Sequence, residues 1–193
     1  MQVQLTDITP DAEQKIATAA SICYDSKTDF ESNNKRLKLL LNLKHLTTLR
    51  FANATFKISG ISRTCTHQLV RTAHAGFLQR SQRYVDESGV QVVIPPSYEE
   101  LSPQLSEEVL AHIHNAEKLY KALREAGIPK GDARFMLLEG SESSIYMTGN
   151  FQMWLEWLEK RTDKHAQWEI RETAIQIGKI LAQHAPNVFE DYK

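Results

Sequence analysis

The 193-residue sequence lacks several features that would identify its class at once. No apolar run approaches the ~20 residues that span a bilayer, and the N-terminus lacks the basic and apolar segments of a secretory signal. The two cysteines, Cys23 and Cys65, have no CxxC spacing, which argues against a disulfide framework and favours a reducing compartment. We therefore expect a cytoplasmic protein that has no membrane anchor.

A strong charge of one sign is also missing. The formal net charge is −1, whereas a general nucleic-acid binder is usually strongly basic over one face. The sequence contains no internal repeat and no low-complexity linker. His112 and His114 lie two residues apart, a spacing that puts them on different faces of a helix and makes a poor metal pair. The sequence thus predicts neither nucleic-acid binding nor a metal site.

Apolar periodicity and turn residues predict several helices around a few strands. Thr9, Pro10 and Asp11 are typical of a helix start, with Thr9 as the cap. The predicted helices cover 11–23, 36–44, 62–72, 102–126, a short stretch from 129, a segment around 154–158, and 166–185. The predicted strands cover 51–62, 91–94 and 143–148, and Ser81–Tyr84 is expected to end a turn and enter a strand. This pattern favours an α+β fold in a single domain over 1–193, with a mainly antiparallel sheet flanked by long helices.

Positive charge is concentrated in residues 62–84 of a chain that is otherwise nearly neutral. This segment contains Arg63, Arg71, Arg80 and Arg83. An arginine presents its donors in a planar fork that matches phosphate oxygens, and the neighbouring Gln, Ser and Tyr side chains can bind a polar ring edge. Any one arginine is more often a solvated surface charge. Together they indicate a site for a small phosphorylated ligand that forms hydrogen bonds.

Two blocks of the sequence carry a resemblance to a known family. The first is Arg71 followed by Ser81-Gln82-Arg83-Tyr84, and the second runs from Arg161 through Ala166-Gln167-Trp168-Glu169-Ile170 to Arg171. In these blocks the sequence resembles the flavin-dependent thymidylate synthases, over a span from about residue 45 to residue 168. The resemblance implies the fold of that family and a homotetramer whose active sites lie between subunits.

The resemblance also implies a reaction. Members of this family transfer a one-carbon unit from methylenetetrahydrofolate to the uracil C5 of dUMP, and they use no cysteine nucleophile. FAD lies against the uracil ring and passes on a hydride from NADPH. The resemblance therefore implies FAD as cofactor, NADPH and methylenetetrahydrofolate as co-substrates, and a pyrimidine deoxynucleoside monophosphate as the substrate that becomes dTMP.

Individual residues receive roles through the same resemblance. The positions that hold the nucleotide, or lie beside it, are Gln68, Arg71, Gln79, Arg80, Ser81, Arg83, Arg134 and Arg161. Of these, Ser81 and Arg161 are expected to act in catalysis, with Arg161 polarising the pyrimidine by stabilising charge on a ring oxygen. Tyr84 either contributes to this set or packs with a satisfied hydroxyl. The positions near the flavin and the folate are His45, Thr47, Arg50, Thr72, Ala73, Asn150, Gln152 and Glu156.

The chain departs from the family pattern mainly on the flavin side. The family signature is Arg-His-Arg, seven residues and Ser, which here reads Arg71-Thr72-Ala73, seven residues and Ser81. A glutamate of the first flavin-side segment is replaced by Arg50, the family's Asn-x-Arg has become Asn150-Phe151-Gln152, and an asparagine position carries Glu156. Our hypothesis is that FAD binds in an altered pose, weakly, or not at all.

These departures leave three functions open. The first is methylation of dUMP with FAD and NADPH. The second is hydroxymethylation of dUMP or dCMP with little or no flavin, in which water captures the exocyclic methylene. The third is a non-catalytic nucleotide-binding homologue. Arg50 and Arg80 are charges that the family pattern does not require and that can compensate on the flavin side, while the amide of Gln79 suits either uracil or cytosine.

Overall fold

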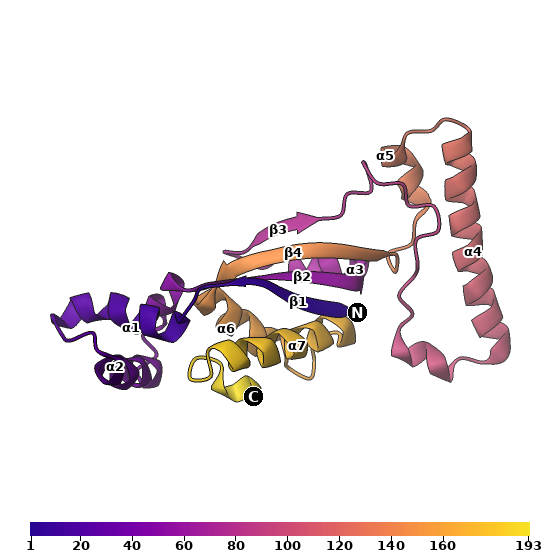
Figure 1. Cartoon of the computed structure of the whole chain (residues 1–193). Coiled ribbons are helices and arrows are strands. Elements are labelled where there is room, and N and C mark those ends of the chain that lie inside the picture. The colour runs from indigo at the N-terminus through magenta and orange to yellow at the C-terminus, as the bar shows by residue number, and fades with distance from the viewer. The chain divides into compact units, whose positions relative to one another are not determined.

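The computed structural model describes the backbone of residues 1–193 and every side chain except that of Tyr24. The helices and strands in chain order are β1 (Gln2–Ile8), α1 (Ala12–Ser21), α2 (Phe30–Asn42), β2 (Asn53–Ser62), α3 (Arg63–Leu69), β3 (Gly76–Gln79), α4 (Pro103–Glu125), α5 (Lys130–Ala133), β4 (Glu142–Asn150), α6 (Phe151–Arg161) and α7 (Trp168–His184). The strands form one antiparallel sheet in the order β1-β2-β4-β3 (Figure 1). The α+β class predicted from the sequence is confirmed.

The chain divides into two compact units. Unit 1 consists of Met1–Ile58, Gln68–Leu78 and Tyr146–Lys193, and unit 2 consists of Ser59–His67 and Gln79–Ile145. Strands β2 and β4 each contribute residues to both units. The description of 1–193 as one domain stays a prediction.

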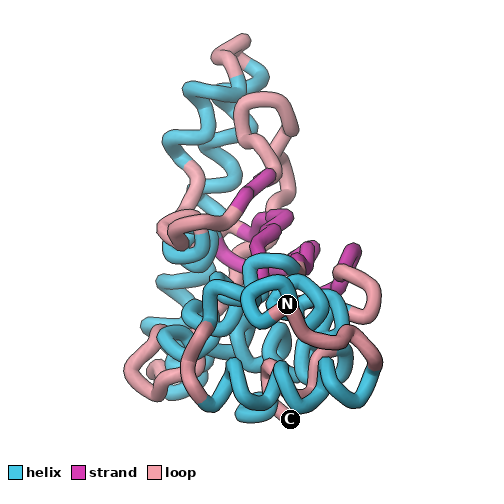
Figure 2. Tube along the Cα trace, turned by 90° about the vertical axis from the view of Figure 1, so that its left-hand side faces the viewer, coloured by secondary structure: helices cyan, strands magenta, loops and turns pink.

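The core of unit 1 forms where α6 packs against the sheet. Ala54, Phe56 and Ile58 of β2 alternate with more exposed residues and are fully buried, as the period-two pattern predicts. Trp154 of α6 meets the ring of Phe56 edge-on at 5.2 Å between centroids, and its indole nitrogen donates to the Ala54 carbonyl at 3.1 Å. In Figure 1, α6 and α7 lie on one side of the strands of this unit, and Figure 2 shows helices on the side of the strands where the C-terminus lies.

Unit 2 contains α4, the longest helix of the chain. The side chain of Ser102 accepts a hydrogen bond from the backbone nitrogen of Leu105 and so caps its start. The helix ends before Gly127, whose φ of 85° lies in the left-handed region that glycine adopts without strain. Tyr120 is the only fully buried residue of α4. None of the described helices, α4 included, is long and apolar enough to cross a membrane.

Two strand predictions are corrected by the structure. The strand β3 precedes Ser81–Tyr84, and that motif forms a turn after the strand instead of leading into one. The stretch 91–94 forms only an isolated bridge between Val92 and Ser141, because Pro95 and Pro96 follow at once and cannot extend a ladder. The polar motif is therefore held by turn contacts instead of ladder hydrogen bonds.

The N-terminal predictions also need correction. The sequence analysis did not predict strand β1. The hydroxyl of Thr9 accepts a hydrogen bond from the Asn53 backbone at 2.9 Å, next to the start of β2, so Thr9 does not cap α1. The second helix begins at Phe30 and not near residue 36, because Asp29 accepts a hydrogen bond from the Ser32 backbone and caps it there.

Candidate functional site

Unit 1 contains a cavity of about 450 Å³ beside α6. Four of its lining side chains are basic and only one is a carboxylate, so the cavity favours an anionic ligand. Its lining residues are Arg50, Arg71, Thr72, Ala73, His74, Asn150, Gln152, Met153, Glu156, Trp157, Lys160 and Arg161. The cavity thus brings together six predicted cofactor positions and two predicted nucleotide positions.

The periodicity of α6 explains why so many predicted residues meet here. Gln152, Glu156 and Lys160 recur at intervals of four and therefore share one face of the helix. Trp154 points into the core from another face. Asn150 starts the helix, because its side-chain oxygen accepts a hydrogen bond from the Met153 backbone at 2.9 Å. The cap and the core packing together fix which face borders the cavity.

Three of the predicted cofactor residues form one chain of hydrogen bonds. The Nε of Arg50 donates to the Gln152 side-chain oxygen at 2.7 Å. The Gln152 side-chain nitrogen donates in turn to a carboxylate oxygen of Glu156 at 2.8 Å. The amide oxygen of Gln152 thus faces the cation of Arg50, and its amide nitrogen faces the carboxylate of Glu156. The arginine at position 50 is thus held in place at the edge of the cavity.

Two polar groups of the cavity wall have no hydrogen-bond partner among the described residues. They are the hydroxyl of Thr72 and the indole nitrogen of Trp157, which is 3% exposed. A buried donor without a partner is costly, so such groups are rare unless a ligand, an ion or water completes them. A bound ligand with hydrogen-bond acceptors, such as a flavin, would satisfy these donors if its acceptors reached them. This part of the cavity therefore fits the cofactor that the resemblance implies.

Three predicted residues of unit 1 lie outside the cavity lining. His45 and Thr47 are exposed and flank the start of the short 3-10 helix Leu46–Phe51. Gln68 donates to the side-chain oxygen of Gln167 at 3.4 Å. None of them borders the cavity, and their predicted roles stay predictions, as do those of the residues that line it.

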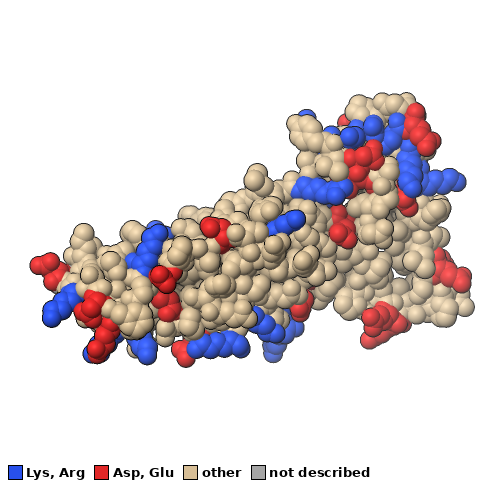
Figure 3. All heavy atoms as spheres, in the orientation of Figure 1, with Lys and Arg blue, Asp and Glu red and all other residues tan. Residues whose placement is uncertain are grey.

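Unit 2 carries the remaining predicted nucleotide residues. Arg83 and Arg134 line a hollow of about 690 Å³, which Lys130 and Arg124 also border. Figure 3 shows basic side chains gathered at the end of unit 2 where α4 and α5 lie. Arg134 is fixed by a hydrogen bond from its Nε to the Gly131 carbonyl at 3.1 Å. This surface, like the cavity of unit 1, suits an anion.

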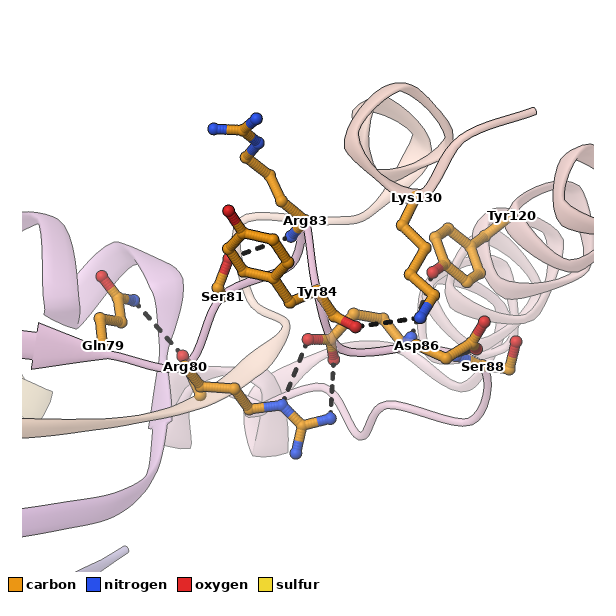
Figure 4. A network of polar contacts seen from close by, with 11 residues as sticks. Gln79, Arg80, Ser81, Arg83, Tyr84, Asp86, Ser88, Tyr120 and Lys130 are labelled. Atoms are coloured by element: carbon orange, nitrogen blue, oxygen red, sulfur yellow. Dashed lines mark hydrogen bonds and ion pairs between the residues drawn. The ribbon is translucent and has the colours of Figure 1, made fainter.

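The turn after β3 holds the polar motif of unit 2 (Figure 4). The Ser81 hydroxyl oxygen accepts a hydrogen bond from the Arg83 backbone at 3.2 Å, and the Arg83 guanidinium lies 5.9 Å from the centre of the Tyr84 ring. The side-chain nitrogen of Gln79 donates to the hydroxyls of Thr66 at 2.8 Å and of Ser143 at 3.3 Å. Ser81 keeps its own O–H free to donate to a ligand.

A second, smaller hollow in unit 2 lies beside Arg63. It measures about 310 Å³ and also borders Arg134 and Glu139. The pKa of the Arg63 guanidinium is lowered, mainly by burial, and the nearby Glu139 carboxylate offsets only part of this shift. Among the described side chains, no group of three His, Cys, Asp or Glu residues could hold a metal ion.

The sequence reasoning missed several residues of the unit 1 cavity. His74, Met153, Trp157 and Lys160 line it and were not predicted. Lys160 follows from helical spacing, because it lies four residues after the predicted Glu156 and shares its face. His74 has a φ of 61°, a conformation that sequence periodicity does not reveal.

The sequence was compared with protein families and with characterised proteins. The sequence model of the family described as "Thymidylate synthase complementing protein" matches residues 4–187. The chain belongs to this family. The flavin-dependent thymidylate synthase of Geobacter sulfurreducens is 36% identical over 203 residues, covering 99% of this chain and 86% of that protein.

Further members give the same result. The flavin-dependent thymidylate synthase of Mycobacteroides abscessus is 34% identical, covering 90% of this chain and 77% of that protein. That of Corynebacterium efficiens is 35% identical, covering 94% and 80%. Similarity to thymidylate synthase complementing proteins therefore extends well beyond the two sequence blocks that first indicated the family.

We expect Asn150→Ala to lower the free energy of unfolding by about 1 kcal/mol, because the first turn of α6 loses its side-chain acceptor. Asn150→Asp keeps an acceptor at the same place and should retain most of the stability. Urea unfolding of the two variants and the unaltered protein measures the difference. Equal stability of Asn150→Ala and the unaltered protein would contradict the capping role.

Proposed function

We propose that the chain is a thymidylate synthase that transfers the one-carbon unit of methylenetetrahydrofolate to C5 of dUMP and releases dTMP. The observation that carries the proposal is the similarity to flavin-dependent thymidylate synthases along nearly the whole chain, 36% identical over 99% of it in one case. The cation-lined cavity of unit 1 and the arginine-rich surface of unit 2 support it, because substrate and cofactor are both anionic.

The positions that the family resemblance gives to the nucleotide include two arginines in each unit. Arg71 and Arg161 supply charge in unit 1, and Arg83 and Arg134 supply it in unit 2. Arg161 ends α6 and is only partly exposed, so its charge is less screened than at an open surface. It stabilises negative charge on a pyrimidine oxygen as C5 becomes nucleophilic. Ser81 donates its hydroxyl hydrogen to the polar edge of the base.

The unit 1 cavity is the proposed flavin site. Arg50 and Lys160 supply positive charge for the diphosphate of FAD. They replace the charge that is missing at Thr72 and Ala73, where the family pattern has histidine and arginine. The unpartnered donors of Thr72 and Trp157 serve the acceptors of the same molecule. When bound, the flavin supplies the hydride transfer from NADPH that reduces the one-carbon unit. The protein positions that molecule, and Gln152 with Glu156 holds Arg50 toward it.

No observation favours either of the other two functions. Hydroxymethylation without flavin needs another means of activating C5. Cys65, the remote candidate for a nucleophile, is fully buried among core residues. A non-catalytic homologue would not need the cavity and its unpartnered donors, which suit a bound cofactor.

We further propose that the protein is a cytoplasmic homotetramer with active sites between subunits. The family resemblance supports the assembly, and the sparse cysteines support a reducing compartment. Light scattering during gel filtration should give the mass of four copies of the 22.0 kDa chain. A mass equal to one chain at micromolar concentration would overturn the assembly.

The central test combines a spectrum with a product assay. We expect the purified protein to retain FAD after desalting and to show a flavin absorption band that NADPH bleaches when dUMP is present. Addition of methylenetetrahydrofolate should then give dTMP by mass spectrometry. A colourless protein that FAD cannot reconstitute, or a hydroxymethyl product, would overturn the proposal.

We expect Trp157→Phe to weaken FAD binding by about 3- to 10-fold, because it removes one donor while keeping an aromatic ring. The matched control is Trp154→Phe in the same helix, which removes the donor to the Ala54 carbonyl. The control should lower the stability of the flavin-free protein more than Trp157→Phe does, with a smaller effect on FAD affinity. Fluorescence titration and urea unfolding measure the two effects, and an unchanged affinity of Trp157→Phe would contradict the contact.

A further inference from the structure

The turn that carries Ser81 and Arg83 is spanned by an ion pair whose carboxylate is buried. The guanidinium of Arg80 meets the carboxylate of Glu87 through two contacts, Nε to Oε1 at 3.2 Å and Nη2 to Oε2 at 3.4 Å. The Glu87 side chain is 1% exposed, whereas that of Arg80 is 42% exposed. The two residues therefore close the segment 80–87 through their side chains (Figure 4).

Other contacts of unit 2 hold the closed segment. The Arg80 backbone nitrogen donates to the Ser144 carbonyl at 2.9 Å, which ties the start of the segment to β4. The Glu87 backbone nitrogen donates to the hydroxyl of Tyr120 at 3.1 Å, and Tyr120 is fully buried on α4. Lys130 donates to the Tyr84 carbonyl at 2.9 Å between these two ends. Each end of the segment is thus fixed to regular structure.

The guanidinium groups of Arg80 and Arg83 point in different directions. The two donors of Arg80 that the structure uses point to Glu87, while the Arg83 guanidinium extends away from this network in Figure 4 and borders the basic hollow of unit 2. Arg80 and Ser81 are adjacent, so fixing the backbone of Arg80 also fixes that of Ser81. The charge of Arg80 is used within the protein, and the charge of Arg83 remains available to a ligand.

We propose that Arg80 and Glu87 form a clamp that positions Ser81 and Arg83 for the nucleotide, with Arg80 itself making no contact to it. Arg80 is then a positioning residue of the reaction, and this assignment rests on the proposed function of Ser81 and Arg83. Removing the cation that faces a buried carboxylate is more harmful than replacing both residues, because the single removal leaves the buried charge without its ion-pair partner. The difference between the single and the double variant therefore distinguishes a clamp from a direct contact with the ligand.

The test compares Arg80→Met, Glu87→Gln and the double variant. Arg80→Met should raise the KM for dUMP by roughly tenfold or more, because it strands the Glu87 carboxylate. It should change kcat and FAD affinity much less. The double variant should recover to within about threefold of the unaltered protein, because Glu87→Gln removes the stranded charge and leaves a side chain of similar shape. The control is Lys121→Met, which breaks an exposed pair with Glu117 in the same unit and should leave the KM unchanged.

A second measurement follows the segment without substrate. Hydrogen exchange of amides 81–88 should become faster in Arg80→Met and return to normal in the double variant. A double variant that is as weak as Arg80→Met in KM would indicate direct contact and overturn the clamp, as would an unchanged KM or unchanged exchange in Arg80→Met. If the unaltered protein does not bind dUMP, the proposed function fails, whereas the exchange rates still decide whether the clamp exists.

Discussion

The packing of Trp154 against β2 is the constraint on which the unit 1 cavity depends. Its indole is fully buried, stacks edge-on against Phe56 and donates to the Ala54 carbonyl, so α6 cannot rotate about its axis without breaking all three conditions. With that rotation fixed, the helical repeat places Gln152, Glu156 and Lys160 on the cavity side. The packing of Trp154 in the core therefore determines which residues of α6 face the cavity. A change in this packing would displace the cavity residues that α6 supplies.

Three of the departures from the family pattern lie in contact with one another. The pattern has an acid where Arg50 stands, an arginine at Gln152 and an asparagine at Glu156, so the total charge of the three positions is the same in both arrangements. Arg50 contacts Gln152, and Gln152 contacts Glu156, through hydrogen bonds of 2.7 and 2.8 Å. A cation and an anion have moved among residues that touch. The changes at these three positions are therefore coupled through direct contacts, whereas Thr72 and Ala73 lie outside this chain of hydrogen bonds.

Sequence reasoning predicted best where one periodic signal dominated. The alternation of Ala54, Phe56 and Ile58 correctly predicted a strand, and a helix around Trp154 was also correct. It failed at Ser81–Tyr84, because a turn closed by side chains has no periodicity, and at Thr9, whose hydroxyl meets a backbone nitrogen 44 residues away. Six of the eight predicted cofactor positions meet in one cavity, but the order along the chain could not indicate that Trp157 would lack a hydrogen-bond partner.

Arg80 shows why the role of a charge cannot be read from residue type alone. In the sequence it is one of four arginines in a short segment, and residue type alone does not distinguish it from Arg83. In the folded chain, burial of Glu87 decides its role, because a carboxylate that is 1% exposed requires a cation and Arg80 is the one that reaches it. Among the other arginines of the segment, Arg63 also interacts electrostatically with Glu87, which offsets part of the lowering of the Arg63 pKa by burial, but Arg80 is the one that hydrogen-bonds to the carboxylate. An arginine beside a proposed substrate site is therefore available to the substrate only if no buried carboxylate of the fold already pairs with it.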